Sequence, residues 1–333
     1  MKATRGAFLA GVAAGGAVAT ARPVFAAANP ETVKSATKGL TFTTLRDRGV
    51  DHLGIRTSKG IVDVGLAAKS MGISNPPMHV DDVIVGAGDI GALARIAANA
   101  PASAIRDPNA VEYGPLAANP PKILCIGLNY AAHIEEMHDK IAPDPELFNK
   151  YNSSLNRHKG TIKISGMPGE GHFDYETELV AFIGKSGKNI PESQALDHVF
   201  GYAIGHDFTD RYEQYKLTQW LPGKAPDQYA PLGPWLVTAD QIPDPQKLQI
   251  QTFVNDETTP RQNMSTAQMM RPVSRLIAYC SSFVQLVPGD IIYTGTPPGV
   301  IYGYPKDKQV WLKPGDRIRS TITNLGELTF TLV

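Results

Sequence analysis

The chain has 333 residues, of which 42% are hydrophobic and 19% charged, and 32 Lys and Arg residues balance 32 Asp and Glu residues. This is an ordinary globular composition. Zero net charge, without a basic cluster interleaved with aromatic residues, gives no indication of nucleic-acid binding. There are two cysteines and no Cys/His cluster, so neither a disulfide framework nor a zinc site is indicated.

Residues 1–28 have the features of an export signal. Two basic residues near the start precede an Ala- and Gly-rich apolar stretch at 7–21, and Ala26–Ala28 supplies small residues for cleavage. The stretch is too short and too weakly apolar to anchor in a bilayer, so we expect no stable membrane span after signal removal. Gly6 stands where a twin-arginine signal has its second arginine, which leaves the twin-arginine and general secretion routes open. We expect an exported, periplasmic protein; the alternative is a cytoplasmic protein with an Ala-rich N-terminus.

Residues 29–115 are predicted to form a small N-terminal α/β domain. The pattern at 89–98 is helical, and Asp89 is a candidate N-cap. Prolines cluster at 107–121 and mark a boundary, so a larger domain is expected at 116–333. Three short stretches of the small domain have strand patterns: 41–45, 52–56 and 60–64.

The larger domain opens with a short buried strand at 123–126, followed by a helix over 130–137 for which Asn129 is a candidate cap. His133 and Glu136 are three residues apart and share one face of that helix. A carboxylate beside an imidazole holds its tautomer and raises its basicity, which suits a general base for water. The alternative is a surface contact between the two side chains.

The stretch 173–184 alternates as a strand and carries Glu176 and Glu178. Side chains two apart on a strand share a face, so these carboxylates are expected to repel each other unless a cation lies between them. Asp207 ends the next strand pattern and would add a third oxygen ligand for a hard divalent cation. The alternative is a set of exposed acids on an edge strand.

Further polar side chains follow the third acid. Arg211 and Gln214 stand at +4 and +7 from Asp207, so a helical turn would present both on the side of that acid. Lys224 lies in a Gly- and Pro-rich loop, and such groups near a metal could bind a carboxylate and stabilise an oxyanion. The alternative for each is a solvated charge. Residues 138–172 are predicted to be a long loop of the kind that often forms a lid. The remaining expected elements are a short helix at 191–199, strands at 200–207, 248–254 and 290–293, a hairpin turn at 255–257, a helix at 271–286, and two or three strands within 308–332.

With these elements placed, residues 120–333 resemble the fumarylacetoacetate hydrolase family. No single motif is specific, but the ordered set is. The motifs are GLNYAAHIEEM (127–137), FNKYNSSL (148–155), DYETELVAFIGK (174–185), GYAIGHDFTDRYEQ (201–214), GKAPDQYAPLGPW (223–235), LVPGDIIYTGTPPGV (286–300) and LKPGD (312–316).

The resemblance implies an α+β, mainly β fold, in which a mixed β-roll catalytic domain follows a small N-terminal α/β domain, and a homodimer. It implies that the three acids bind Mg²⁺ or Mn²⁺, with Ca²⁺ possible, and that the histidine and glutamate activate water on a mobile lid. It further implies that three side chains contact the substrate or its oxyanion, that Thr296 binds the substrate carboxylate, and that Lys150 of the second motif binds substrate. In this sequence the three substrate-contacting side chains are Arg211, Gln214 and Lys224, the acids are Glu176, Glu178 and Asp207, and the water-activating pair is His133 and Glu136.

The expected reaction is metal-dependent hydrolysis of a C–C bond in a β-diketo or 2-oxo acid of the acylpyruvate type, with the cation holding the departing enolate. Alternatives are a decarboxylase or isomerase of 2-oxo or 2-hydroxy-diene dioates at the same site, and an exported 2-oxo-acid binding protein without turnover. The chain departs from the family pattern at Tyr212, where Asp is common, and at Ala225, where Ser is usual. Leu128–Asn129 offers no fourth carboxylate, which favours the broader bacterial branch over fumarylacetoacetate as the substrate.

Overall fold

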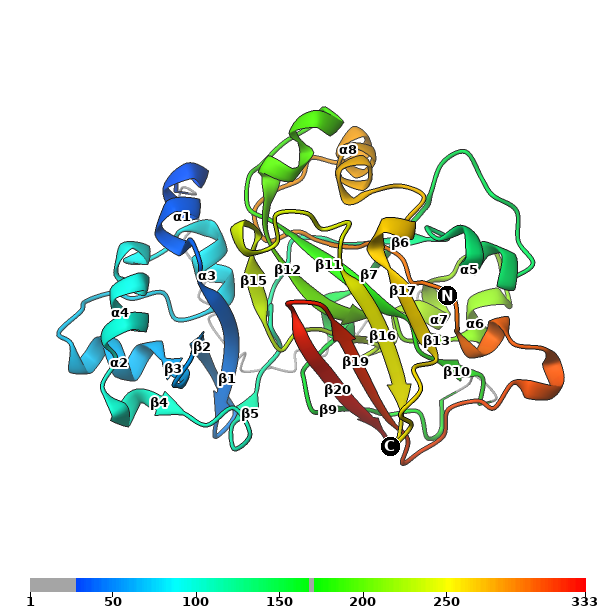
Figure 1. Ribbon diagram of the computed structural model, residues 1–333, viewed down its shortest axis with the longest axis horizontal. Coiled ribbons are helices and arrows are strands. Elements are labelled where there is room, and N and C mark those ends of the chain that lie inside the picture. The colour runs from blue at the N-terminus through cyan, green and yellow to red at the C-terminus, as the bar shows by residue number, and fades with distance from the viewer. Residues whose placement is uncertain (1–27, 168–170) are drawn as a thin grey trace, which may run out of the picture.

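The computed structural model describes residues 28–167 and 171–333. The predicted export signal falls almost wholly outside this range. Within the described residues, no helix has the length and apolar character needed to span a bilayer. The chain forms a smaller N-terminal unit beside a larger body built on β-strands (Figure 1).

The N-terminal unit is a small sheet covered by short helices (Figure 1). All three predicted strands form, and the predicted helix begins as a 3₁₀ turn in which Asp89 Oδ1 accepts from Ala92 N at 3.2 Å. Four helices, of which only the one at 93–99 was predicted, bury residues such as Val33, Val83 and Ile96 against this sheet. The strands are β1 (Thr41–Asp47), β2 (Val50–Thr57), β3 (Gly60–Asp63), β4 (Ile105–Arg106) and β5 (Glu112–Tyr113), and the helices are α1 (Pro30–Thr37), α2 (Val64–Ser70), α3 (Val80–Val85) and α4 (Leu93–Asn99).

One sheet runs from this unit into the larger body in the order β4-β3-β2-β1-β15-β12-β11-β18-β6-β7, with β5 added beside β1. The junction is the antiparallel pair of β1 and β15, in which Phe42 lies opposite Leu236. The strand β11 is buried along its whole length, because a second sheet covers it. The body's strands in this sheet are β6 (Ile123–Gly127), β7 (Glu146–Lys150), β11 (Thr177–Ile183), β12 (Val199–His206), β15 (Leu236–Thr238) and β18 (Ile291–Tyr293).

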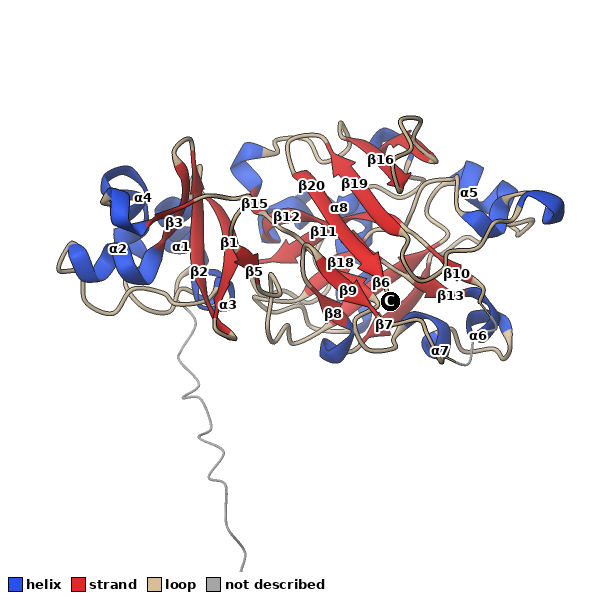
Figure 2. Ribbon diagram, turned by 90° about the horizontal axis from the view of Figure 1, so that it is seen from below, coloured by secondary structure: helices blue, strands red, loops and turns tan. Residues whose placement is uncertain are grey.

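The second sheet has five strands in the order β17-β16-β19-β20-β9, and it lies across the first (Figure 2). Ile250, Ile322 and Leu328 from this sheet pack against Leu179 and Ile204 of β11 and β12. Its strands are β9 (Gly160–Ile162), β16 (Gln249–Val254), β17 (Gln262–Ser265), β19 (Arg317–Ile322) and β20 (Gly326–Leu332). Two small two-stranded sheets pair β10 (Phe173–Asp174) with β13 (Thr209–Asp210) and β8 (Leu155–Asn156) with β14 (Ala230–Pro231). The body's helices are α5 (Ala131–Glu136), α6 (Arg211–Tyr215), α7 (Leu221–Lys224) and α8 (Val273–Phe283).

Three local expectations about secondary structure are wrong. Residues 138–172 are not a structureless loop, because the segment contributes β7, which pairs with β6, and β8 and β9, which pair with the distant strands β14 and β20. The predicted strand over 173–184 is broken before Thr177, since β10 pairs with β13 while β11 pairs with β12. Lys224 ends the short helix α7 instead of lying in a loop. The short helix predicted over 191–199 does form, as a 3₁₀ helix at Glu192–His198.

Asn129 does not cap the helix that follows it. The N-cap position is Tyr130, and the Asn129 amide instead accepts from Arg271 N and donates to the carbonyls of Arg271 and Thr294, at 2.9–3.0 Å. A buried amide is stabilised more by three partners than by one cap bond. Asn129 therefore joins the start of α5 to the segment after β18.

Candidate functional site

Three acidic side chains converge where β11 begins and β12 ends. Each of Glu176, Glu178 and Asp207 offers a carboxylate oxygen that lies within 4.8 Å of those of the other two. Asp207 comes close because β11 and β12 pair antiparallel, and Asp207 N donates to Glu176 O at 3.0 Å. All three are at most 4% exposed, so the alternative of exposed edge acids is wrong.

Three basic side chains neutralise part of this acid cluster. Lys224 Nζ lies 2.7 Å from both Glu176 Oε2 and Asp207 Oδ2. Lys150 Nζ lies 2.7 Å from Asp207 Oδ1, and Arg211 Nη1 lies 2.7 Å from Glu176 Oε1. Burial by itself would raise the pKa of Glu176, but Lys224 and Arg211 outweigh it and lower the pKa to about 2.

Glu178 is the member of the cluster that these bases do not balance. Among the described residues no Lys, Arg or His lies within ion-pair distance of it, and Gly295 N donates to its Oε2 at 2.6 Å. Burial raises the pKa of Glu178 well above its usual value, and the charges of Asp207 and Glu176 raise it further. An ionised carboxylate in this position needs a cation, and three buried carboxylate oxygens are ligands that Mg²⁺ and Mn²⁺ prefer. The residues therefore fit a divalent cation.

The predicted base dyad forms on α5. His133 Nδ1 lies 2.7 Å from Glu136 Oε1, and the imidazole is 4% exposed, so the alternative of a surface contact is wrong. The other carboxylate oxygen of Glu136 accepts from Gly299 N at 2.8 Å. With the Nδ1 proton directed at Glu136, His133 Nε2 is available to accept a proton.

A small cavity of about 20 Å³ joins the acids to the dyad. It has room for about one water molecule, so an oxo acid requires the cavity to widen. Its apolar wall includes Met137 of the segment after α5 and Trp220 beside α7. Seven of the ten predicted site residues line it: His133, Glu176, Glu178, Arg211, Gln214, Lys224 and Thr296.

The other predicted residues lie just behind the cavity. Asp207 and Glu136 touch lining residues through the contacts given above. Lys150 is not among the lining residues; besides Asp207, its ammonium contacts the backbone carbonyls of Lys224 and Tyr229. The structure thus places Lys150 where it holds the acid cluster, and its contact with substrate stays a prediction.

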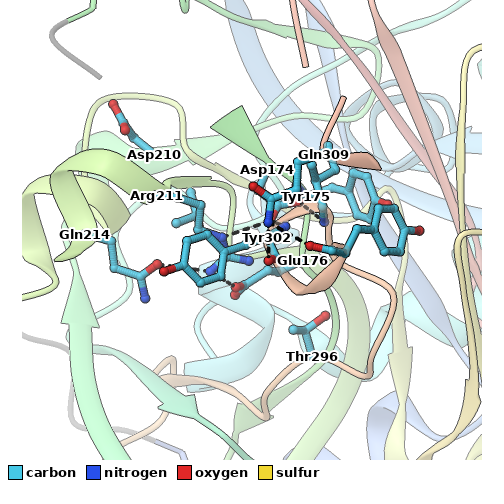
Figure 3. Close-up of polar contacts among 12 residues, drawn as sticks. Asp174, Tyr175, Glu176, Asp210, Arg211, Gln214, Thr296, Tyr302 and Gln309 are labelled. Atoms are coloured by element: carbon cyan, nitrogen blue, oxygen red, sulfur yellow. Dashed lines mark hydrogen bonds and ion pairs between the residues drawn. The ribbon is translucent and has the colours of Figure 1, made fainter. Parts of the chain in front are cut away.

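Arg211 has one uncommitted donor. Its Nε donates to Asp174 Oδ2 at 2.9 Å, and its Nη1 donates to Gln214 Oε1 at 3.0 Å as well as pairing with Glu176 (Figure 3). Its Nη2 is buried and has no hydrogen-bond partner among the described residues. A buried donor of this kind, on a side chain that lines the cavity, is suited to an oxygen of a bound anion.

Sequence reasoning missed two buried residues of the site. Asp174 accepts hydrogen bonds from Arg211 and from backbone amides of the segment after β18. Gln262 donates to Thr296 Oγ1 at 2.8 Å, and Thr296 in turn donates to Thr177 O at 3.0 Å. Asp174 opens the acidic motif and could have been suspected, because it precedes Glu176 by two residues. Gln262 gave no signal, because its partners are distant in sequence.

Fold and site together define a mixed β protein with a buried carboxylate centre next to a histidine–glutamate dyad. The family model for the fumarylacetoacetate (FAA) hydrolase C-terminal region matches residues 122–333. The chain belongs to the fumarylacetoacetate hydrolase family, whose members are enzymes that include hydrolases, isomerases and tautomerases.

Among similar proteins, the mitochondrial oxaloacetate tautomerase fahd2 of Xenopus laevis is 45% identical over 217 residues, or 65% of this chain and 66% of that protein. The chain thus spans slightly less than two thirds of the length of that relative. The structure of fumarylacetoacetate hydrolase from Exiguobacterium antarcticum has a TM-score of 0.73 at 30% identity, covering 88% of this chain and 99% of that one. Fumarylpyruvate hydrolase from Pseudomonas aeruginosa, solved with Mn²⁺ and pyruvate, has a TM-score of 0.57 at 35% identity, covering 64% and 89%.

Proposed function

We propose that this protein hydrolyses a C–C bond in a β-diketo or 2-oxo acid of the acylpyruvate type, with a divalent cation. The observation that carries the proposal is the dyad of His133 and Glu136, of which His133 lines the same cavity as Glu176 and Glu178. A binding protein needs the acids but has no use for a buried, oriented general base. The alternative of an exported binding protein without turnover is therefore less well supported.

The cation would be held by Glu176, Glu178 and Asp207. A bound Mg²⁺ or Mn²⁺ supplies Lewis acidity, which polarises the oxygens of an oxo acid. Mn²⁺ with pyruvate in the Pseudomonas aeruginosa hydrolase supports this choice of cation and of ligand class.

Charge balance favours an anionic substrate. The buried set around the cavity has four acids against three bases, which leaves one net negative charge. A divalent cation would turn that into one positive charge, which a substrate carboxylate would balance. The free Nη2 donor of Arg211 is the group best placed for that carboxylate. The residues in this count are Asp174, Glu176, Glu178, Asp207, Lys150, Arg211 and Lys224.

The chemical step needs a base for water and donors for an oxyanion. His133 Nε2 would take a proton from water while Glu136 keeps the imidazole oriented and stabilises its cationic form. The resulting hydroxide attacks the distal carbonyl of the substrate. The C–C bond then breaks, its electron pair stays on the 2-oxo acid fragment as an enolate, and this enolate takes up the proton that His133 removed from water. Lys224 and Gln214 line the cavity and would stabilise the tetrahedral oxyanion.

Tautomerisation of a 2-oxo dioate such as oxaloacetate is the second candidate, and the 45% identity to an oxaloacetate tautomerase favours it. In that reaction the dyad would move a proton between carbon and oxygen without the addition of water. Decarboxylation or isomerisation of a related dioate would equally proceed without an attacking water. The candidates therefore differ in whether water enters the product.

Two assays with Mg²⁺ or Mn²⁺ decide between them. Hydrolysis predicts that ¹⁸O from water enters the carboxylate released from an acylpyruvate, and that His133→Ala loses at least about 10²-fold in kcat. Tautomerisation predicts accelerated decay of the enol absorbance of oxaloacetate without ¹⁸O-labelled cleavage product. His52→Ala, which changes a histidine of β2, is the matched control. Wild-type rates in His133→Ala would refute the role of the dyad in either reaction.

A further inference from the structure

Asp174 is a fully buried carboxylate whose hydrogen-bonding capacity is used inside the protein. Its Oδ1 accepts from Tyr175 N and Ile301 N, both at 2.9 Å, and its Oδ2 accepts from Tyr302 N at 3.1 Å and from Arg211 Nε at 2.9 Å (Figure 3). A carboxylate has about four lone-pair sites, and each of these four donors takes one. Asp174 therefore has no lone pair left for substrate or cation, and its influence passes through the groups that it holds.

One group of partners belongs to the segment 299–303, which forms a seat for Glu136. Gly299 N donates to Glu136 Oε2 at 2.8 Å, and Tyr175 Oη donates to Gly299 O at 2.8 Å. At Gly303 an added Cβ would lie 2.6 Å from Glu136 Cδ and 2.8 Å from Oε2, so only glycine leaves room for the carboxylate there. Asp174 thus fixes, through Ile301 and its neighbour, the backbone against which the dyad glutamate rests.

The other partner leads to the acid cluster. Arg211 donates to Asp174 through Nε and pairs through Nη1 with Glu176 Oε1 at 2.7 Å. Because the guanidinium is planar and rigid, fixing its Nε edge also fixes the direction of its other nitrogens. The same carboxylate therefore sets the position of an arginine that faces the cavity.

We infer that Asp174 is a positioning residue that ties the base dyad on α5 to the acid cluster through two arms, the seat 299–303 and Arg211. This inference rests on the proposed function for the roles of the dyad and the acids. It adds that their relative placement is set by one buried side chain from β10. The arm through the seat acts on Glu136 alone, and the arm through Arg211 acts on Glu176, so single substitutions separate them.

The first test uses hydrogen–deuterium exchange and needs no substrate, so it remains informative if the proposed reaction is wrong. Gly303→Ala should raise the amide exchange rate of residues 131–137 about tenfold, since the added methyl group displaces the Glu136 carboxylate that accepts from Gly299 N. Exchange in β11 should stay at the wild-type rate. The matched control is Gly91→Ala, where the added Cβ meets only Asp89 Oδ1 at 3.4 Å. If residues 131–137 of Gly303→Ala exchange at the wild-type rate, segment 299–303 does not hold Glu136 in place and the inference fails.

The second test measures both arms together. Asp174→Asn should raise exchange at 131–137 and also weaken Mn²⁺ binding, measured by calorimetry, by about tenfold, because Arg211 and with it Glu176 lose their fixed position. Asp290→Asn is the control, since Asp290 is equally buried and pairs with Lys122 at 2.8 Å away from the cavity. It should lower the melting temperature without either of the other effects. If Asp174→Asn behaves like Asp290→Asn, Asp174 has only a structural role and the inference fails.

Discussion

Glu178 provides the sharpest test of the cation site. It is buried, carries no ion pair among the described residues, and stands beside Asp207 and Glu176, which together with burial raise its pKa. Glu178→Gln keeps the shape and removes a charge that the cation-free protein has to neutralise by protonation. We therefore expect the cation-free variant to be as stable as the wild type or more stable, by up to about 1–3 kcal/mol.

With Mn²⁺ present, Glu178→Gln should instead be less stable than the wild type. A ligand at 100 times its dissociation constant stabilises the folded state by about 2.7 kcal/mol, which raises the melting temperature by about 5–10 °C in a domain of 150–250 residues. Wild type should show a shift of this order with Mn²⁺, and Glu178→Gln should lose most of it.

The matched comparison is Glu176→Gln, assayed by thermal melting in EDTA and in Mn²⁺. Glu176 pairs with Lys224 and Arg211, so removing its charge leaves buried bases short of a partner and should destabilise the cation-free protein by about 3 kcal/mol. In EDTA we expect Glu178→Gln to leave the melting temperature unchanged or raise it, and Glu176→Gln to lower it. In Mn²⁺ both variants should lose the rise in melting temperature that the wild type shows. A full Mn²⁺ shift in Glu178→Gln would refute the assignment of the cation to these acids.

Three further outcomes are expected. Burial lowers the pKa of His158 to about 4, and its Nδ1 accepts from Thr329 N at 3.1 Å, so only the unfolded chain takes up its proton as the pH falls below 6.5. This histidine should remove up to about 3 kcal/mol of stability between pH 6.5 and 4, and denaturant melts of His158→Asn should show a correspondingly flatter pH dependence. Lys150→Met should lower the free energy of unfolding by about 3 kcal/mol because Asp207 loses a buried partner; a raised KM at unchanged stability would instead support direct substrate contact. Expression in a bacterial host should yield periplasmic protein whose intact mass lacks residues 1–28, and full-length cytoplasmic protein would contradict the export signal.

Local spacing was enough to predict much of the site. The two-residue interval between Glu176 and Glu178 sets both carboxylates on one face of an extended chain, and the three-residue interval between His133 and Glu136 does the same on a helix. The structure confirms both, with the acids clustered within 4.8 Å and the dyad joined at 2.7 Å. Such relations follow from the geometry of a single element and need no knowledge of its neighbours.

The contacts of the site that local spacing does not predict depend on pairing between segments that are distant in sequence. Glu176 and Asp207 meet only because β11 and β12 pair antiparallel in one particular register. The choice of Arg271 and Thr294 as partners for Asn129 depends on contacts across more than 100 residues, which no local pattern encodes.

The sequence by itself indicated which side chains could bind a cation or accept a proton, and it determined which way they point along their own strand or helix, because backbone periodicity is local. Only the tertiary structure decided that the three acids have three buried basic neighbours, that segment 138–172 contributes an edge strand to each of the two large sheets, and that Asp174 holds two parts of the site together. Buried polar groups need hydrogen-bond partners, and the fold can supply these partners from any part of the sequence, so local patterns do not predict them.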